Sequence, residues 1–363
     1  MFAMKRNYGI DLLRMVLMLM VVVIHVLTHG GVIKATEQLS ANYSMSILME
    51  SFVFCAVNCY ALISGYVYID SRYRFSGLVQ IWLQALLYSL GIAVFVWILK
   101  PEYFSFEGLL IHSFPVSNAP YWYLSAYVGL FVLIPFLNAG IHSLSNEQAK
   151  KYQALLFFVF SIIPTIARKD TFFVNVGYST IWLSYLYGIG ACIKKFGWGD
   201  SLKPCKAIWI YVCCVVISWG MKVGCESVTN YLLGTPKTGF ILIAYTSPTI
   251  IIAAIALLIA FKNMRIPTRF NGFISAFAPA AFGVYLIHEH EYFRNQFILN
   301  KFAFLAKLST PVMIIGVLSA ALVIFAVCLL IDWIRYKIFV RLRVKERLER
   351  IEEKYIRFNI AIK

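Results

Sequence analysis

Ten apolar runs, each close to twenty residues long, follow one another along this chain. An α-helix rises about 1.5 Å per residue, so about twenty apolar residues cross the roughly 30 Å hydrocarbon core of a bilayer. The sequence therefore predicts an all-α, polytopic membrane helix bundle of about ten transmembrane helices. The predicted spans are 9–28, 46–69, 78–99, 121–141, 152–168, 176–193, 206–224, 240–261, 272–291 and 311–334.

The composition supports a membrane protein and argues against other classes. Hydrophobic residues make up 61% of the chain and charged residues only 14%, whereas about a quarter of the residues in a soluble domain are charged. The net charge of +16 does not indicate nucleic acid as a partner, because the cations lie in short segments between apolar runs and after the last one. The eight cysteines fall mostly inside those runs without paired C-x-x-C motifs, which favours neither zinc nor a disulfide framework.

The distribution of Lys and Arg predicts the orientation of the bundle. With the N-terminus in the cytoplasm, 23 of these residues lie on cytoplasmic segments, 9 lie on outer loops and Arg14 lies within a span. An excess of cations marks the cytoplasmic side, so both termini are predicted to be cytoplasmic. We divide the chain into a transmembrane domain, 1–335, and a basic amphipathic cytoplasmic tail, 336–363. The tail is predicted to lie on the anionic inner leaflet, with a plain solvated helix as the alternative.

The first span carries ionisable side chains on one helical stripe. Arg14 and His25 are eleven residues apart, almost three full turns, so they share a face about 16 Å apart along the axis. Asp11 lies one turn before Arg14 and can pair with it, and His29 lies one turn beyond His25. Each residue alone has a simpler explanation: Arg14 can extend its side chain to the inner lipid headgroups, and His25 can form an interhelical hydrogen bond. Their shared stripe favours a polar corridor inside the bundle.

Four short motifs occur in order between residues 9 and 290. They are IDLLRMVLMLMVVVIH in the first span, ALISGYVYI at 61–69, PYWYLSAYVGLFVLIP at 120–135 and AFGVYLIHEH at 281–290. Together they resemble acyltransferase family 3, the integral membrane O-acyltransferases, whose hallmark is an Arg or Lys, ten residues and then a His. Two positions depart from the family pattern: Glu289 follows Y-L-I-H, and Glu50 lies in the second span.

The resemblance implies an enzyme of the acyltransferase class. Such a protein moves an acyl group, usually acetyl from acetyl-CoA, onto a hydroxyl of a glycan or cell-envelope acceptor outside the membrane. It implies a multi-pass protein of the bacterial plasma membrane, with acyl-CoA as donor substrate and no metal. The alternative is a transporter or exporter of polysaccharides or small molecules, because charges inside the membrane also mark transport pathways.

The inner end of the predicted corridor gathers candidates for binding coenzyme A. They are Arg14, Ser64, Gly65, Arg72 and Arg74, whose depth places them near the cytoplasmic side. Cations suit the phosphates of the donor, and a glycine permits close approach of the backbone. The alternatives are that Arg72 and Arg74 serve only to orient the protein and that Gly65 serves helix packing.

The outer half gathers the catalytic candidates His25, Glu50, His288 and Glu289. Both histidines lie about fifteen residues into outward-running spans, so we expect them at matching depth. A neutral imidazole can take the proton of an acceptor hydroxyl, and a carboxylate can orient that imidazole. An acyl-histidine intermediate is the other route. The alternative without a catalytic role is that His288 makes an interhelical contact and that the two glutamates lie at the membrane interface.

Three aromatic residues are candidates for binding the acceptor. Tyr285 lies one turn before His288, and Trp122 and Tyr123 begin a span at its outer end, where aromatic anchoring is the alternative explanation. The H-E-H-E run is not predicted to bind metal. His288 and His290 are two residues apart, so they point in different directions on a helix, unlike the histidines of H-E-x-x-H.

Overall fold

The computed structural model describes residues 6–117, 121–237 and 242–355, which are helical without any strand. The α-helices are α1 (Tyr8–Leu27), α2 (Val32–Ala35), α3 (Ala41–Val53), α4 (Ala56–Tyr68), α5 (Phe75–Leu99), α6 (Phe106–Ser113), α7 (Trp122–Ser143), α8 (Asn146–Phe157), α9 (Ile163–Ala167), α10 (Thr180–Phe196), α11 (Pro204–Leu233), α12 (Pro248–Asn263), α13 (Asn271–Phe277), α14 (Ala281–His288), α15 (Glu291–Phe297), α16 (Thr310–Arg341) and α17 (Val344–Tyr355). Short 3-10 or π turns are η1 (Pro101–Tyr103), η2 (Phe158–Ile162), η3 (Asn175–Gly177), η4 (Thr268–Phe270), η5 (Ala278–Ala280) and η6 (Ala303–Lys307).

The all-α membrane fold is confirmed in its coarse form. In the described part of the chain, 8 helical segments are long and apolar enough to cross a bilayer. They are Tyr8–Ala35, Ala41–Tyr68, Phe75–Leu99, Trp122–Ser143, Asn146–Ala167, Pro204–Leu233, Thr268–His288 and Thr310–Arg341. Four of them join two or more of the helices above across a short irregularity.

Two of the ten predicted spans do not reach that length. The run at 176–193 coincides with α10, a helix of 17 residues, and the run at 240–261, whose first two residues lie outside the described ranges, coincides with α12, of 16. At about 1.5 Å per residue these helices rise about 24 to 26 Å, less than the hydrocarbon core. Both are mostly buried among other helices. The count of ten spans therefore stays a prediction.

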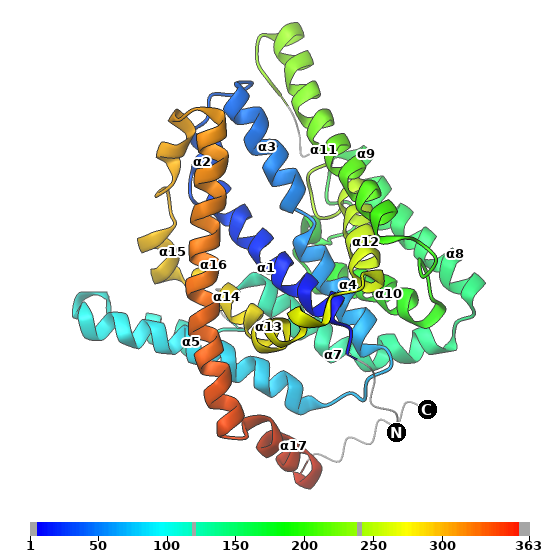
Figure 1. Ribbon diagram of the computed structural model, residues 1–363, viewed down its shortest axis with the longest axis vertical. Coiled ribbons are helices and arrows are strands. Elements are labelled where there is room, and N and C mark those ends of the chain that lie inside the picture. The colour runs from blue at the N-terminus through cyan, green and yellow to red at the C-terminus, as the bar shows by residue number, and fades with distance from the viewer. Residues whose placement is uncertain (1–5, 118–120, 238–241, 356–363) are drawn as a thin grey trace.

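The first helix occupies the centre of the bundle. It packs against α3, α4, α12, α14 and α16, so helices from both halves of the chain surround it (Figure 1). Most of its residues are buried, including several on the stripe that carries its charged groups. The side chains on that stripe therefore face other helices rather than lipid.

Glycines set the spacing between α4 and α10. A Cβ atom added to Gly65 would lie 1.9 Å from the carbonyl oxygen of Tyr187, and one added to Gly190 would lie 1.9 Å from that of Leu62. Only glycine permits two helix backbones to approach this closely. Gly65 thus serves helix packing, the alternative to its predicted contact with coenzyme A.

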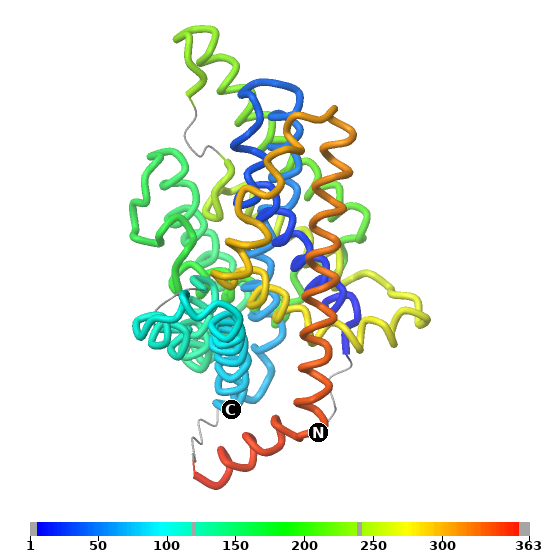
Figure 2. Tube along the Cα trace, turned by 90° about the vertical axis from the view of Figure 1, so that its left-hand side faces the viewer, coloured from blue at the N-terminus to red at the C-terminus, as the bar shows by residue number. Residues whose placement is uncertain are grey.

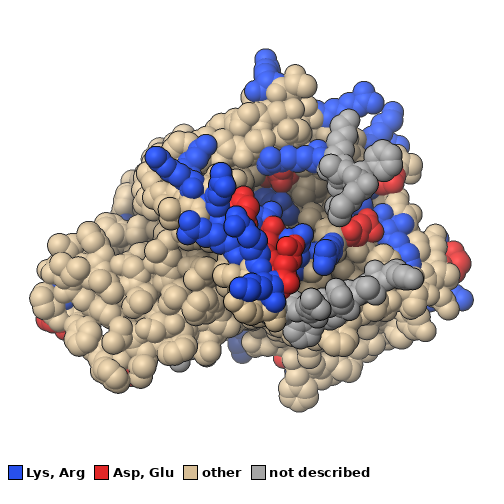
Figure 3. Space-filling view, turned by 90° about the horizontal axis from the view of Figure 1, so that it is seen from below, with Lys and Arg blue, Asp and Glu red and all other residues tan. Residues whose placement is uncertain are grey.

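Both described ends of the chain lie at the same end of the molecule. The start of α1 and the whole of α17 are found there (Figures 1 and 2). Seen from below, this face carries Lys and Arg side chains around a hollow, with Asp and Glu among them (Figure 3). Termini on one side agree with the predicted topology, and the assignment of that side to the cytoplasm stays a prediction.

The tail helix docks on the bundle. The carboxylate of Glu352 in α17 accepts hydrogen bonds from the backbone N–H groups of Phe75, at 2.7 Å, and Ser76, at 3.0 Å, at the start of α5. Arg74 pairs with Glu349 at 3.1 Å. The predicted boundary at residue 335 falls inside α16, which continues to Arg341. The described tail therefore packs against α5, and residues 356–363 lie outside the described ranges.

Removing the Glu352 carboxylate should loosen this docking. We expect Glu352→Ala to cost about 0.5 to 2 kcal/mol of local stability, the usual cost of losing a helix cap. Limited trypsin digestion should then cleave within α17 faster than in the unchanged protein. Glu346→Ala is the control, because that side chain is exposed on the same helix. Equal cleavage rates for both variants would show that Glu352 does not hold the tail.

Candidate active site

Two histidines far apart in the sequence meet inside the bundle. Nδ1 of His25, near the end of α1, lies 2.8 Å from Nε2 of His288, the last residue of α14. Glu289 follows directly, and its Oε1 atom lies 3.0 Å from the same Nδ1 atom. The expectation of matching depth is met, and three of the four catalytic candidates form one cluster.

The hydrogen bonds fix which ring nitrogen of His25 is free. Nδ1 of His288 lies 2.6 Å from the carbonyl oxygen of Val284, which can only accept, so this Nδ1 carries a hydrogen. In a neutral His288 the Nε2 atom then accepts, and Nδ1–H of His25 donates to it. The lone pair of neutral His25 is therefore on Nε2, for which no described residue provides a hydrogen-bond partner. His25 is arranged as a base.

Glu289 supplies the negative charge of the cluster. The residue is only 9% exposed, and its Oε2 atom lies 3.5 Å from a guanidinium nitrogen of Arg294 in α15. Its Oε1 atom accepts no hydrogen bond from the described residues, because Nδ1–H of His25 is directed to His288. A carboxylate at this position stabilises the imidazolium that forms when His25 takes a proton.

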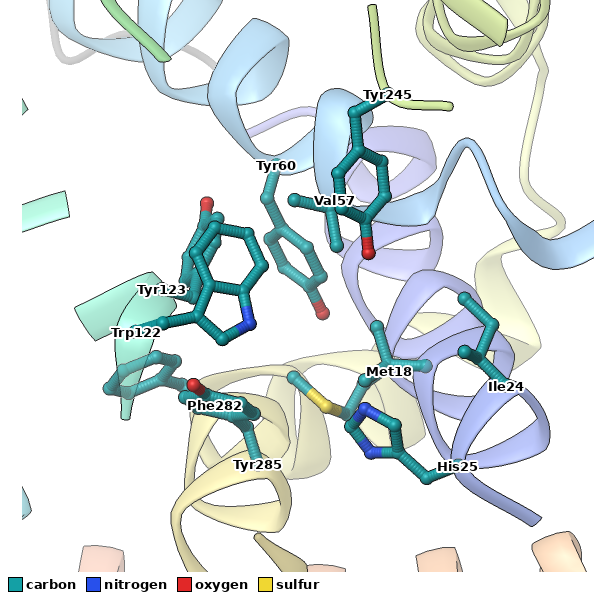
Figure 4. Close-up of a pocket in the computed structure, with 11 residues that line it drawn as sticks. Met18, Ile24, His25, Val57, Tyr60, Trp122, Tyr123, Tyr245, Phe282 and Tyr285 are labelled. Atoms are coloured by element: carbon teal, nitrogen blue, oxygen red, sulfur yellow. The ribbon is translucent and has the colours of Figure 1, made fainter. Parts of the chain in front are cut away.

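A cavity whose empty space, including the part open to its surroundings, is about 500 Å³ lies beside His25. Figure 4 shows the imidazole reaching from α1 toward aromatic rings carried by α4, α7 and α14. All three acceptor candidates belong to its wall. The lining residues are Met18, Val21, Ile24, His25, Val57, Tyr60, Trp122, Tyr123, Tyr245, Phe282 and Tyr285.

A second cavity, whose empty space including its open part is about 870 Å³, lies beside Arg14. Arg14 and Ser64 are the predicted donor residues in its wall, together with Gln80, Gln84 and Tyr127. Tyr60, Tyr123 and Phe282 line both cavities, so the two spaces adjoin at these aromatic residues. The stripe from Arg14 to His25 thus runs between two adjoining cavities.

Tyr123 has an unpaired hydroxyl in this shared wall. Its Oη atom is buried and has no hydrogen-bond partner among the described residues. The hydroxyl of the neighbouring Tyr60, by contrast, donates to the carbonyl oxygen of Arg14 at 2.6 Å. Buried polar atoms are nearly always bonded, so an unpaired one between two cavities is suited to a bound molecule.

Several predicted site residues lie elsewhere. Glu50 in α3 forms no described hydrogen bond or ion pair with His25, and the carboxylate beside the imidazole is that of Glu289. Arg72 is exposed after the end of α4, and Arg74 is paired with the tail. Neither arginine, nor Gly65, is part of the described wall of the Arg14 cavity.

The H-E-H-E run diverges as predicted. His288 turns to His25, whereas Nε2 of His290 lies 2.9 Å from the carbonyl oxygen of Ser89 in α5. These two histidines therefore do not converge on one point.

Three residues that shape the site were not predicted from the sequence. Tyr60 lies four residues before Ser64, and this helical spacing could have placed both on one face. Arg294 and Tyr245 lie in a short helix and in an irregular segment, where no periodicity indicates which way a side chain points.

These features define a membrane-embedded helical protein with a largely buried centre for acid–base chemistry beside two cavities. A family model described as an acyltransferase domain matches residues 7–333. The chain therefore belongs to acyltransferase family 3, in agreement with its four motifs, and is a membrane acyltransferase. Searches of curated proteins and of solved structures found no significant match.

Proposed function

We propose that this protein transfers an acetyl group from acetyl-CoA to a hydroxyl of an extracytoplasmic glycan or other cell-envelope acceptor. The observation that carries the proposal is the pair of adjoining cavities, one lined by Arg14 and the other by His25, which share three aromatic residues in their walls. Two spaces joined at one wall suit a reaction between two substrates that enter separately. Membership of an acyltransferase family favours this function over the transporter alternative.

The donor occupies the Arg14 cavity. A guanidinium forms strong charge-assisted hydrogen bonds with phosphate, and Arg14 is one-third exposed while paired with Asp11 at 3.1 Å. Arg14 and His25 are about 16 Å apart along the helix axis, a separation of the order spanned by an extended pantetheine arm. The thioester then lies near the shared wall, within reach of the His25 cavity.

The acceptor occupies the His25 cavity. Its hydroxyl donates to Nε2 of His25, and as its oxygen attacks the thioester carbonyl the proton passes to that nitrogen. A C–O bond forms, the C–S bond breaks, and the proton moves on from His25 to the departing thiolate of coenzyme A. His288 holds the ring through Nδ1, and Glu289 stabilises the transient imidazolium.

Tyr123 contributes to the same step. The residue lines both cavities, and its hydroxyl is buried and unpaired among the described residues. We infer that it donates a hydrogen bond to the thioester carbonyl oxygen, where negative charge develops during attack. A donor placed in advance for that charge stabilises the transition state more than the ground state.

The function is tested with purified protein in lipid vesicles. Labelled acetyl-CoA and a glycan acceptor should yield labelled acceptor and free coenzyme A in equal amounts. Mass spectrometry of surface glycans from cells with and without the gene should show loss of one acetyl increment. Movement of glycan across the vesicles without any acyl-CoA would instead identify a transporter.

Replacing Arg14 should weaken use of the donor more than the chemistry. We expect Arg14→Ala to raise the KM for acetyl-CoA by about 10- to 100-fold, because a hydrogen bond to a charged group contributes about 1.5 to 3 kcal/mol. Arg14→Lys keeps the positive charge, so its KM for acetyl-CoA should lie between those of Arg14→Ala and the unchanged protein. Asp11 retains Arg6 as a partner, so the fold should persist. An unchanged KM in Arg14→Ala would remove Arg14 from the donor site.

A further inference from the structure

Three potential metal ligands lie together around His25. His25, His29 and Glu289 each place one donor atom within 4.8 Å of the other two. Oε1 of Glu289 lies 3.0 Å from Nδ1 of His25 and 3.9 Å from Nε2 of His29. The ring centres of His25 and His29 are 5.0 Å apart. Two imidazoles and one carboxylate form a ligand set that Zn²⁺ commonly uses.

The state of the Glu289 Oε1 atom also indicates a bound ligand. It is buried and accepts no hydrogen bond from the described residues, while Arg294 holds the other oxygen of the same carboxylate. A buried carboxylate oxygen without a partner is costly, so a species that bonds it is favoured. This oxygen is directed toward the two imidazoles rather than toward a basic side chain.

We propose that His25, His29 and Glu289 form an inhibitory site for a divalent transition metal ion such as Zn²⁺. Zinc bonds of about 2.1 Å in a tetrahedron place neighbouring ligand atoms about 3.4 Å apart. The two separations from Glu289, 3.0 and 3.9 Å, bracket that value, and all three donor atoms lie within 4.8 Å of one another, so movement of the side chains can complete the geometry. The side chain of His29 is 40% exposed and gives the ion a route of entry. Water occupies the fourth position.

Coordination would block the base. Zinc needs the lone pair of Nδ1 in His25, so the hydrogen on that atom moves to Nε2 and the bond to His288 breaks. Nε2 then carries a hydrogen and cannot accept a proton from the acceptor hydroxyl. Inhibition in this form rests on the proposed function, whereas metal binding itself does not.

The nearby positive charge limits the affinity. The guanidinium of Arg294 lies 3.5 Å from Oε2 of Glu289, and its charge opposes that of the incoming ion. This charge distinguishes the site from a permanent structural zinc centre. It suits reversible occupancy that follows the metal concentration around the protein.

The test uses the full-length protein purified in detergent and freed of metal. Calorimetric titration with ZnCl₂ should give one site per chain, and Co²⁺ should show the visible absorption of tetrahedral coordination. His29→Gln keeps a polar side chain but loses the ligand, so its zinc affinity should fall at least about tenfold. His142→Gln is the matched control, because that histidine contacts Ile69 elsewhere in the bundle and should leave binding unchanged.

Activity separates the two proposals. His29→Gln should transfer acyl groups at the unchanged protein's rate without zinc and should resist inhibition when zinc is added. Absence of saturable binding, or equal affinity in His29→Gln and the unchanged protein, would overturn the metal site. Zinc binding that His29→Gln weakens, in a protein without acyl transfer, would retain the site and overturn the proposed function.

Discussion

Replacing His25 with alanine lowers acyl transfer by about 10²- to 10⁴-fold, the usual contribution of a general base. The expectation follows from the hydrogen-bond chain that begins at the carbonyl of Val284 and passes through His288. These hydrogen bonds leave the basic lone pair of the neutral His25 ring on Nε2. Without the imidazole, no group in the described cavity wall lies at this position and can take the proton of the acceptor hydroxyl.

The fold must persist for this result to bear on catalysis. His25→Gln provides the companion variant, because its amide can still donate a hydrogen bond to Nε2 of His288 but cannot take a proton. Both variants should elute as the unchanged protein does in size-exclusion chromatography and should lose activity alike. Transfer at the unchanged rate in folded His25→Gln would exclude His25 as the base.

An intact-mass measurement distinguishes the two chemical routes at His25. If the imidazole acts as a base, protein incubated with acetyl-CoA alone keeps its mass. If the imidazole acts as a nucleophile, one acetyl group remains on His25 until acceptor is added. Both routes use the same free Nε2 atom, so the loss of activity expected for the two variants is the same.

Tyr123→Phe should lower kcat by about 10²- to 10³-fold with little change in KM, as expected for the loss of a donor to a developing oxyanion. The hydroxyl has no partner in the described protein, so its removal breaks no observed hydrogen bond. Deleting a buried unpaired polar group is neutral or stabilising for the fold. A loss of rate without a loss of stability therefore separates a role in catalysis from a role in packing.

Tyr185 offers a matched control for this variant. Its hydroxyl is likewise buried and unpaired among the described residues, but the residue lines neither of the two cavities. Tyr185→Phe should leave both kcat and KM unchanged. Thermal unfolding of the two variants should be similar. Equal activity losses in both would indicate a general effect of tyrosine hydroxyls on the bundle, and full activity in Tyr123→Phe would exclude the oxyanion role.

Periodicity predicted positions along single helices correctly. Arg14 and His25 lie on one stripe of α1, and each lines one of two adjoining cavities. His25 and His288 lie close together, as expected from counting about fifteen residues into each of the two predicted spans. Such predictions need only the rise and turn of an α-helix.

Predictions that required a choice among neighbouring helices fared less well. Glu50 and Glu289 were both candidates for the carboxylate at His25, and only Glu289 lies beside it. Arg74 has the charge suited to a phosphate, but it pairs with Glu349 of α17. Charge and predicted depth do not identify the partner in either case, because the facing partner depends on how the helices pack.

The sequence by itself determined an apolar helical membrane bundle, its acyltransferase family and the stripe that joins Arg14 to His25. Those properties follow from local composition and from the fixed geometry of one helix. The tertiary structure decided that His288 holds His25, that Glu289 rather than Glu50 faces it, and that Tyr123 stands between the cavities. Contacts of this kind depend on the rotation and crossing of helices that are distant in the chain, which side-chain packing sets only when the whole bundle assembles.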